Sequence, residues 1–410
     1  MRRVVITGLA CITPCGIGLA DTWSALVAGR SGTKAVSSFD VSRCHSHVAG
    51  EITDFRPEDF LARREIQTFS RYVHFGFAAA RMAWEDARAA GALDPDRVAV
   101  SIGSSIGASS RNISDGVTFA ELGIDRVHPM CPLQYCGSLP SEVAIVLGLR
   151  GPAYSISTAC TAGADATGLA MGLIASGVID AAVVGGSEAP ILPLLFHAFD
   201  RLQVISRLND PPERASRPFS RDRCGFVLAE GAGMLVLEAE DVARERGARI
   251  YAELAGFGAT SDAHHHLHPA PDGRQGARAV ELALRQAGIG AADIDYVNAH
   301  GTGTVKNDAT ETSILKQALG AHAHRIPVSS SKSMLGHMIG AAAAVELVIS
   351  TMSIHERVVP PTINVVEPDP ECDLDYVTEG ARDLAPHAVL STSFGFGSRN
   401  AALVVRKYEA

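Results

Sequence analysis

Short apolar runs alternate along the chain with longer segments in which apolar residues recur at helical spacing. Runs of about four to eight β-branched and apolar residues predict buried strands, and the longer segments predict helices. The predicted strands cover residues 4–9, 98–102, 153–157, 181–185, 233–237, 252–260, 296–300, 327–330, 389–393 and 401–405. The predicted helices cover residues 20–28, 71–90, 141–147, 163–176, 238–246, 275–287, 309–319 and 340–354. This alternation predicts an α/β fold.

The chain also carries a weak internal repeat. Val4-Val-Ile-Thr-Gly begins the first half, and Ala252-Glu-Leu-Ala-Gly begins a similar run later in the chain. Each half then has a strand, a reactive residue at the end of that strand and a helix poor in charge. We therefore expect two similar halves, residues 1–250 and residues 251–410.

The predicted helix over residues 163–176 is apolar nearly all round, so it should be buried. Cys160 stands just before it, where a strand pattern changes to a helix pattern. The positive end of a helix dipole stabilises a thiolate, which is the nucleophilic form of cysteine. Free cysteine is also among the most buried residue types, so a small core residue fits this stretch equally well.

Composition narrows the class of protein. The 410 residues are 47% hydrophobic and 20% charged, which is typical of a globular enzyme with a large core. A net charge of −9 argues against a general role in binding nucleic acid or membrane surfaces. The eight cysteines form no CxxC pair, which favours a reducing, cytoplasmic compartment.

We expect no targeting or membrane-spanning segment. The N-terminal apolar run is interrupted at Gly8, Pro14 and Gly16, which favours a strand and a turn over a signal peptide. Segment 339–352 is apolar, but it carries Glu346 and is too short to cross a bilayer.

Two histidines follow predicted strands and stand next to small residues. His300 precedes Gly-Thr-Gly-Thr, which lets backbone and hydroxyl groups approach a ligand closely. Lys332 and His337 flank the turn after the strand at residues 327–330, and Glu346 lies in the apolar helix beyond. A buried carboxylate needs a partner, and Lys332 is the best candidate for Glu346.

Acidic residues and glycines mark three more segments. Asp308 and Glu311 begin the helix after His300, where negative charge suits the helix dipole. Phe396 lies in a Gly-Phe-Gly turn whose backbone N–H groups could face an oxyanion, although a plain hairpin would look the same. The histidines at residues 264–268 follow Asp262; their spacing is unlike that of zinc sites and favours a polar loop near a pocket mouth.

Cys160, His300 and His337, in this order and each in its own motif, resemble the active site of a β-ketoacyl-acyl carrier protein synthase. The similarity points to the chain-elongating synthase II type and to the ketosynthase subunits of type II polyketide systems. It runs from Val4 to Val404 and includes the motifs Gly148-Leu-Arg-Gly-Pro152, Ser157-Thr-Ala-Cys160, Gly185-Gly-Ser-Glu188, Ser216-Arg-Pro-Phe219, Gly225-Phe-Val-Leu-Ala-Glu-Gly231, Asn298-Ala-His-Gly-Thr302, Lys332-Ser-Met-Leu-Gly-His337 and Pro360-Pro-Thr-Ile-Asn364.

The resemblance implies the thiolase fold, in which two similar α/β halves form a five-layered αβαβα core, normally in a dimer. Residues 1–250 would carry the nucleophilic cysteine, and residues 251–410 the two catalytic histidines. The implied partner is an acyl carrier protein, loaded with an acyl or a malonyl group. We expect no cofactor, no metal, no nucleic acid and no membrane.

The resemblance also implies a role for each motif. Cys160 would hold the acyl chain as a thioester while His300 and His337, both neutral, stabilise the enolate left when malonyl loses CO2. The backbone N–H groups of Cys160 and Phe396 would bind the oxyanion formed on the acyl thioester. Lys332 and Glu346 would pair and order the site.

The same resemblance assigns the substrate-facing surfaces. Ile106 and Phe396 resemble a gating pair at the acyl pocket, which Met130 and Phe199 would help to line. Carrier docking would use basic residues, here Arg63, Arg64, Arg71, Arg201 and Arg207. Segments 128–137 and 194–199 are atypical, and Ser398-Arg399-Asn400 replaces the usual Gly-Thr-Asn, which predicts a specialised substrate or carrier.

Four alternatives remain. The chain could be an elongating fatty-acid synthase acting as a homodimer, or the catalytic ketosynthase of a polyketide or polyene system, paired with a chain-length factor. A non-catalytic chain-length partner is disfavoured because Cys160, His300 and His337 are all present. A thiolase would need a second catalytic cysteine, and neither Cys224 nor Cys372 stands in such a motif.

Overall fold

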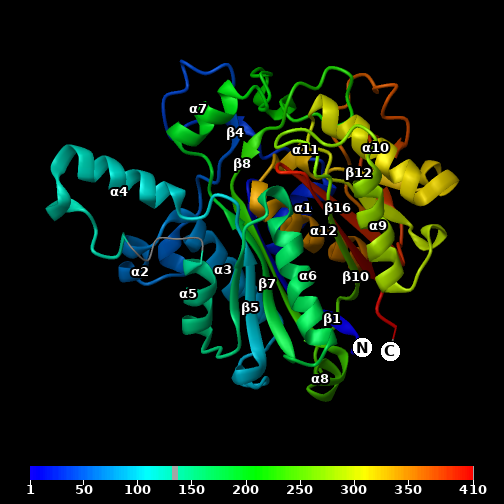
Figure 1. Ribbon diagram of the computed structural model, residues 1–410, viewed down its shortest axis with the longest axis horizontal. Coiled ribbons are helices and arrows are strands. Elements are labelled where there is room, and N and C mark those ends of the chain that lie inside the picture. Colours follow the sequence, from blue (N-terminus) through cyan, green and yellow to red (C-terminus); the bar gives the residue numbers. More distant parts are fainter. Residues whose placement is uncertain (132–136, 410) are drawn as a thin grey trace.

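The computed structural model describes residues 1–131 and 137–409 (Figure 1). Its strands are β1 (Val4–Thr13), β2 (Gly16–Ile17), β3 (Lys34–Ala35), β4 (Val48–Gly50), β5 (Val98–Gly103), β6 (Ala153–Ile156), β7 (Ala181–Glu188), β8 (Leu228–Ala229), β9 (Gly231–Ala239), β10 (Ala252–Ser261), β11 (Tyr296–Asn298), β12 (Pro327–Ser329), β13 (Val358–Val359), β14 (Asp375–Tyr376), β15 (Arg382–Asp383), β16 (Ala388–Gly395) and β17 (Arg399–Arg406).

The helices alternate with these strands, which confirms the predicted α/β class. They are α1 (Leu19–Val27), α2 (Arg63–Thr68), α3 (Arg71–Asp86), α4 (Ser109–Leu122), α5 (Ser138–Leu147), α6 (Ala162–Ala175), α7 (Pro193–Arg201), α8 (Glu240–Glu245), α9 (Arg274–Ala287), α10 (Val305–Leu319), α11 (Lys332–Leu335) and α12 (Ala342–Glu356). Short 3-10 turns, η5 (Ala159–Thr161) and η9 (Ile339–Ala341), lead directly into α6 and α12.

One mixed sheet of twelve strands organises the described residues, in the order β14-β12-β11-β16-β17-β10-β1-β9-β7-β5-β6, with β2 paired to β1. Its two sides follow one plan. On one side β6, β5 and β7 are parallel, and β9 and β1 continue antiparallel. On the other side β12, β11 and β16 are parallel, and β17 and β10 continue antiparallel.

The two sides join where β1 meets β10 through the residue pairs Val5–Glu253 and Ile6–Ala252. The sheet is therefore two matching five-stranded units, with β14 added at one edge, as the internal repeat predicts. The turns η5 and η9 strengthen the match, because both contain a non-glycine residue at positive φ, Ala159 at 55° and Ile339 at 45°.

Five layers follow from this plan. Helices α3 and α5 pack on the outer face of the first unit, and α9 and α10 cover the outer face of the second. Helices α6 and α12 contact each other between the two units (Figure 1). They approach closely at Gly163, where a Cβ atom would come within 2.9 Å of the backbone nitrogen of Ala344.

Burial explains why the central elements are so apolar. Every residue of β7 and β9 is buried, because helices cover both faces of these strands. Helix α12 is buried from Ala342 to Ile354, and α6 is nearly as enclosed. By contrast α9 lies on the outside and has one apolar face, with Ala279, Val280 and Ala283 turned inward. The predicted burial of residues 163–176 is therefore confirmed for most of α6.

All ten predicted strands and all eight predicted helices have counterparts, with shifted ends. The helix expected over residues 238–246 begins only at Glu240, because β9 continues to Ala239. Helix α3 ends at Asp86 rather than residue 90, and α10 begins at Val305 rather than residue 309. The segment expected to be a loop after the strand at residues 327–330 contains the short helix α11.

Helices α2, α4 and α7 have no counterpart among the predicted helices, and the stretch that contains α12 is longer than expected. Helix α4 was not predicted; it projects from the body (Figure 1), and its apolar residues Val117, Phe119 and Leu122 are exposed, so it has no core-facing stripe to detect. The helical stretch Ile339–Glu356 is longer than expected and would suffice to cross a membrane by length and composition, but 89% of it is buried inside the protein. That burial is the arrangement of a core helix.

Candidate active site

Cys160 lies at a tight turn between β6 and α6. The turn η5 carries the preceding residue, Ala159, in the left-handed region at φ 55°, which turns the chain sharply into the helix. The turn after β16 packs against this corner: a Cβ atom on Gly395 would lie 3.2 Å from the backbone nitrogen of Cys160. The Cys160 side chain is 5% exposed and contacts an apolar cluster that includes Phe196 and Phe226.

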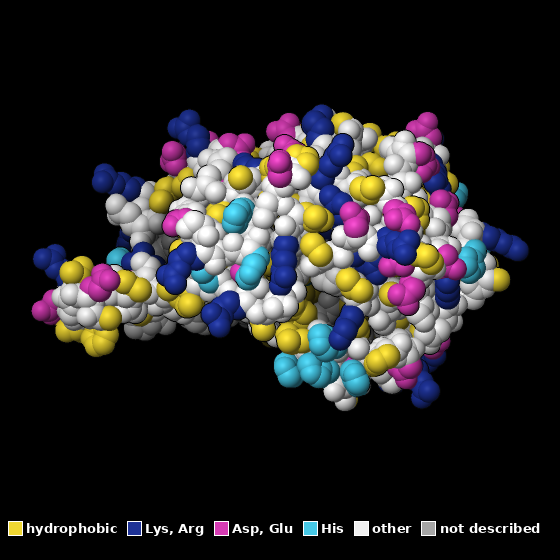
Figure 2. Space-filling view, turned by 90° about the horizontal axis from the view of Figure 1, so that it is seen from above, with side chains coloured by type: hydrophobic (Ala, Val, Ile, Leu, Met, Phe, Trp, Pro, Cys, Tyr) yellow, Lys and Arg dark blue, Asp and Glu magenta, His cyan; other side chains and the backbone are white. Residues whose placement is uncertain are grey.

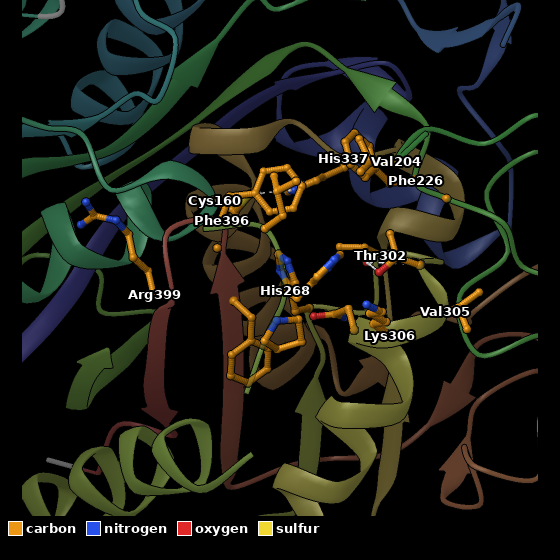
Figure 3. A pocket seen from close by; sticks show the side chains of 18 of the residues that line it. Cys160, Val204, Phe226, His268, Thr302, Val305, Lys306, His337, Phe396 and Arg399 are labelled. Atoms are coloured by element: carbon orange, nitrogen blue, oxygen red, sulfur yellow. Dashed lines mark hydrogen bonds between the residues drawn. The ribbon is translucent and has the colours of Figure 1, made fainter. Parts of the chain in front are cut away.

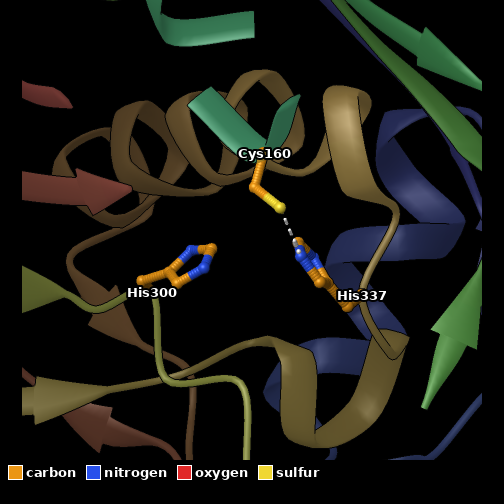
Figure 4. A group of neighbouring side chains, drawn as sticks. All are labelled: Cys160, His300 and His337. Atoms are coloured by element: carbon orange, nitrogen blue, oxygen red, sulfur yellow. Dashed lines mark hydrogen bonds between the residues drawn. The ribbon is translucent and has the colours of Figure 1, made fainter. Parts of the chain in front are cut away.

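His337 faces this cysteine from the loop between α11 and η9. Its Nε2 atom lies 3.1 Å from the Cys160 Sγ atom (Figure 4). The loop is fixed by its backbone, because the His337 N–H donates to the Val227 carbonyl at 2.7 Å and its carbonyl accepts from the Ala229 N–H at 3.0 Å. The Phe226 ring packs edge-on against the imidazole, with the ring centres 5.2 Å apart.

His300 completes the group from the end of β11. Its ring stands at 89° to that of His337, with the centres 5.3 Å apart. The Lys332 ammonium lies 3.2 Å from the His300 Nδ1 atom and, since an ammonium can only donate, Nδ1 is an acceptor. The neutral imidazole therefore carries its proton on Nε2.

Lys332 also forms a buried ion pair with Glu346 of α12, as predicted. Both side chains are 2% exposed. Burial raises the pKa of Glu346 to about 7, while the Lys332 ammonium opposes that rise. The pair places a fixed positive charge beside His300 and links α11 to the central helix.

Burial and the Lys332 charge set the protonation of the two histidines. Burial is the larger cause and the nearby ammonium the second, and together they hold the pKa values of His300 and His337 well below the usual range. Both imidazoles are therefore neutral near pH 7. Each can donate one hydrogen bond without carrying a charge.

The pKa of the cysteine moves in the direction opposite to the one that the helix dipole predicts. Burial raises the pKa of the Cys160 thiol to about 11, although Lys332 and the Phe396 backbone N–H lower it. The thiol is therefore protonated at rest, and the expectation of a thiolate stabilised at the helix end is wrong for the resting site. Deprotonation must accompany attack, and a donor on His337 Nε2, 3.1 Å from the sulfur, can stabilise the thiolate as it forms.

The three catalytic-type atoms lie within 4.8 Å of one another, close enough to ligate one metal ion. The surroundings suit acyl transfer better than zinc, because the Lys332 ammonium at His300 repels a second cation. The ammonium therefore disfavours a metal ion at these three side chains.

Two buried acids hold the His300 loop, a role that the sequence interpretation missed. Glu311 accepts hydrogen bonds from the backbone N–H groups of His300 at 2.8 Å and Gly301 at 2.7 Å. Asp308 accepts from the N–H of Thr302 at 3.1 Å. Both acids are 1% exposed or less, so they face the loop rather than solvent at the helix end.

A third buried acid, Glu188 at the end of β7, connects the loop that carries Ile106 to Gly340 in the second half of the chain. It accepts from the N–H groups of Ser105 at 2.7 Å, Ile106 at 3.1 Å and Gly340 at 3.2 Å. The signal in the sequence is a lone acid at the end of an otherwise uncharged strand, which needs buried partners.

A pocket leads from Cys160, His300 and His337 to the surface (Figure 3). Phe396 lies at the inner end of the pocket, beside Cys160 (Figure 3). Burial raises the pKa of the Cys160 thiol, whereas a hydrogen bond from the Phe396 backbone N–H to the sulfur lowers it. The wall is lined by Thr302, Phe226 and Val204, and the outer part by Leu267, His268, Val305 and Lys306.

The predicted acyl-pocket residues divide into two groups. Phe199 packs edge-on against Phe226 in the apolar cluster beside Cys160. Ile106 and Met130 do not line the described pocket. Residues 132–136 of the atypical segment 128–137 lie outside the described residues.

The predicted docking arginines also divide. Arg63, Arg64, Arg201 and Arg207 are exposed and form no ion pair with any described residue. Arg71 donates instead to both Glu230 oxygens, at 2.9 and 2.8 Å, and stacks on Phe75. Its guanidinium is occupied by a structural contact.

Comparison with known proteins agrees with this geometry. The family descriptions "Beta-ketoacyl synthase, N-terminal domain" and "Beta-ketoacyl synthase, C-terminal domain" match residues 1–243 and 251–366. The chain is 43% identical over 410 residues to 3-oxoacyl-[acyl-carrier-protein] synthase 2 of Synechocystis sp., covering 100% of this chain and 99% of the relative. It is 40% identical over 417 residues to the granaticin polyketide putative beta-ketoacyl synthase 1 of Streptomyces violaceoruber, covering 100% and 99%.

Two solved structures are similar over almost the whole chain. A ketosynthase bound to a hexaketide and in complex with its type II PKS acyl-carrier protein has a TM-score of 0.93 at 34% identity, covering 99% of this chain and 100% of that one. The ishigamide ketosynthase/chain length factor has a TM-score of 0.92 at 34% identity, covering 100% of both chains.

The chain belongs to the β-ketoacyl synthase family. Its fold is the thiolase fold of these ketosynthases, with two pseudo-repeated α/β halves in a five-layered core.

Proposed function

We propose that this protein catalyses the decarboxylative condensation of an acyl chain, held on Cys160, with malonyl-acyl carrier protein. The single observation that carries the proposal is the convergence of Cys160 Sγ and the ring nitrogens of His300 and His337 within 4.8 Å at the inner end of a pocket. This arrangement supplies one nucleophile and two neutral hydrogen-bond donors, which is what thioester condensation needs.

The first half-reaction loads the acyl chain. The Cys160 sulfur attacks the thioester carbonyl of the acyl carrier, and its proton is transferred to the departing carrier thiol. The Nε2–H of His337, 3.1 Å from the sulfur, stabilises the negative charge that develops there during attack. The backbone N–H groups of Cys160 and Phe396 are the proposed donors to the oxyanion. The products are an acyl thioester on Cys160 and the free carrier thiol.

The second half-reaction makes the carbon–carbon bond. Malonyl carrier loses CO2, and the electron pair of the broken bond moves into an enolate whose oxygen accepts from Nε2–H of His300 and of His337. The enolate carbon then attacks the Cys160 thioester. The new β-ketoacyl group stays on the carrier, and the cysteine leaves as a thiolate that takes up one proton.

Lys332 and Glu346 support this step as positioning residues. The ammonium accepts no proton and donates to His300 Nδ1, which keeps the donor proton on Nε2. Burial and then the same charge keep both histidines neutral, so no imidazolium is present to protonate the enolate before it attacks.

We further propose the biological setting. The 43% and 40% identities to a fatty-acid-type and a polyketide-type synthase are too similar to separate elongation of fatty acids from a type II polyketide role. Relatives of known structure assemble with a carrier protein and with a chain length factor, so this chain acts as a homodimer or as the catalytic subunit of such a heterodimer. Exposed Arg63, Arg64, Arg201 and Arg207 are the proposed carrier contacts.

Two expectations from the sequence stay proposals. The division at residues 250 and 251 follows the repeat, and the cytoplasmic location rests on cysteines that form no disulfide among the described residues. A thiolase is the weaker alternative: Cys224 lines the same pocket but stands outside the Cys160–His300–His337 group.

The proposed function is tested by incubating the protein with a panel of acyl-carrier thioesters and measuring its intact mass. One acyl mass should be added to the protein and lost in Cys160→Ala, and malonyl carrier should then yield a β-ketoacyl carrier and CO2. Acylation of the Cys160→Ala protein, or a free coenzyme A thioester as the product, would exclude the assignment.

A further inference from the structure

The histidine loop, defined as residues 262–268, stands at the outer end of the pocket. Cys160 is buried at the inner end of that pocket, whereas His268 and Lys306 on its lining are exposed. The space-filling view shows the histidine side chains gathered beside a hollow in the surface (Figure 2). A ligand that enters through this pocket passes the histidine loop on its way to Cys160.

Three imidazoles of the loop are stacked. The His265 ring lies between those of His266 and His268, with centre distances of 4.2 and 4.7 Å and interplanar angles of 20° and 15°. The Nδ1 atom of His265 accepts from the backbone N–H of Leu267 at 3.0 Å and of His268 at 3.3 Å. The neutral His265 ring therefore carries its proton on Nε2 and offers it as a donor.

The loop is anchored to the turn that holds Phe396. Ser398, at φ 64°, accepts from the N–H groups of His264 and His265 at 3.2 Å each and donates to the His265 carbonyl at 3.0 Å. The Gly397 N–H donates to the His266 carbonyl at 2.8 Å. These contacts fix the imidazoles before any ligand arrives.

The charged groups around the stack favour an anion. Lys306, from the first turn of α10, forms no ion pair or side-chain hydrogen bond within residues 1–131 and 137–409. The acid on the loop, Asp262, is occupied: it accepts from the Asn400 amide at 2.7 Å and from the Ala270 N–H at 2.9 Å. Arg399 also lines the pocket and adds a second cation, a guanidinium whose charge acts on Asp165 as well.

The stack can take up a proton when an anion binds. Desolvation lowers the pKa of His265, followed by the charges of His266, His268, His264 and Lys306. Desolvation also lowers the pKa of His268, followed by the charges of Lys306, His266 and His264. Both are therefore largely neutral near pH 7 in the free protein. An anion beside them offsets that repulsion and raises their pKa, so binding takes up protons.

We propose that His265, His268 and Lys306 form a binding site for the phosphodiester of the carrier protein's prosthetic arm. Such an arm is a phosphopantetheine, with its thioester at one end and its phosphate at the other. The pocket offers matching groups in the same order as the arm: Cys160 at the inner end for the thioester, a wall of Thr302 and Phe226, and cations at the mouth for the phosphate. This inference rests on the proposed function, because it assumes that a carrier delivers the acyl group.

Binding is measured by titration calorimetry with an acyl pantetheine amide, which cannot acylate cysteine, in its phosphorylated and unphosphorylated forms. At pH 6.5 the phosphorylated form should bind about tenfold more tightly, the effect of one charge-assisted hydrogen bond. The difference should shrink as the pH rises to 8.5, and titrations in two buffers should show proton uptake.

Variants assign the effect to the named residues. In the double variant His268→Ala/Lys306→Ala the phosphorylated and unphosphorylated forms should bind with about the same affinity. Lys306→Ala alone should weaken the preference but keep its pH dependence, whereas His268→Ala should reduce that dependence. Lys407→Ala removes an exposed lysine at the C-terminal end of the chain and should change nothing.

Three results would overturn the inference. These are equal affinities of the two forms for the wild-type protein, an unchanged preference in the double variant, and inorganic phosphate binding as tightly as the phosphorylated arm, which would mark a general anion site. Failure of the proposed function is seen separately, as absence of acylation of Cys160 by acyl carriers, because the amides bind without reacting.

Discussion

Replacing Lys332 by methionine should separate the two half-reactions. The side chain is 2% exposed, pairs with Glu346 and donates to His300 Nδ1 at 3.2 Å. Without the ammonium, no partner holds the His300 proton on Nε2, and the second-largest cause of its lowered pKa is gone. His300 then donates poorly to the enolate, and its pKa is lowered by burial and His337 but no longer by the ammonium.

The size of the effect follows from what is lost in each step. Removing one donor to a developing oxyanion costs about 10²- to 10³-fold in kcat, so condensation should fall by roughly that factor. Acyl loading uses Cys160, His337 and backbone N–H groups. Burial raises the pKa of the Cys160 thiol and the Lys332 charge opposes that rise, so loading should fall as well, but by less than condensation. Breaking a buried ion pair by removing one partner also destabilises a protein by about 3–5 kcal/mol, since Glu346 would be left buried and unpaired.

Urea unfolding, intact-mass loading and condensation rates measure these three quantities. The double variant Lys332→Met/Glu346→Leu should recover most of the stability, because no charge remains buried, but not the condensation rate. Lys316→Met removes a lysine from a partly exposed pair with Asp373 and should cost about 1 kcal/mol or less. Equal losses in loading and condensation would refute the positioning role of Lys332.

Three other changes probe the same site. Cys160→Gln should abolish condensation while leaving slow malonyl decarboxylation, measured as CO2 release; continued chain elongation would contradict the nucleophile. Glu311→Gln cannot accept from both backbone N–H groups of the His300 loop, so the free energy of unfolding should drop by about 1–3 kcal/mol and kcat with it, whereas exposed Glu85→Gln should be neutral. In the wild type neither His300 nor His337 should titrate between pH 8 and about 6, because both histidine pKa values are well below the usual value of about 6.5; NMR signals of either imidazole ring that titrate near 6.5 would contradict this.

The parts of the fold that could be predicted are those whose pattern is set by burial. Strands such as β7 and β9 are enclosed on both faces and read as unbroken apolar runs, and α6 and α12 are apolar all round because they lie between two sheets. Helix α4 was missed for a different reason: its apolar residues stand among many polar ones, and Val117, Phe119 and Leu122 are exposed rather than packed on the core. The broad apolar pattern that predicted the other helices comes from packing against a sheet, and α4 lacks that packing.

The site was predictable in its reactive residues but not in its electrostatics. Lys332 could be matched to Glu346 because a buried carboxylate needs a partner, and the structure places them in contact. The protonation of Cys160 depends instead on how deeply the thiol is enclosed, which the sequence around it does not contain. The helix end is present as expected, yet burial outweighs it and raises the pKa to about 11.

Asp308 and Glu311 show what a fuller sequence argument would need. Acids in the first turn of a helix are explained by the dipole alone when the helix end is in water. Here the Gly-Thr-Gly-Thr loop before α10 has no strand or helix to pair its backbone N–H groups, and buried donors must find acceptors. The two carboxylates, each within a turn or so of that loop, are the nearest ones, and they accept from residues 300 to 303. The need of these N–H groups for acceptors therefore predicts that both carboxylates face inward and hold the loop that carries His300.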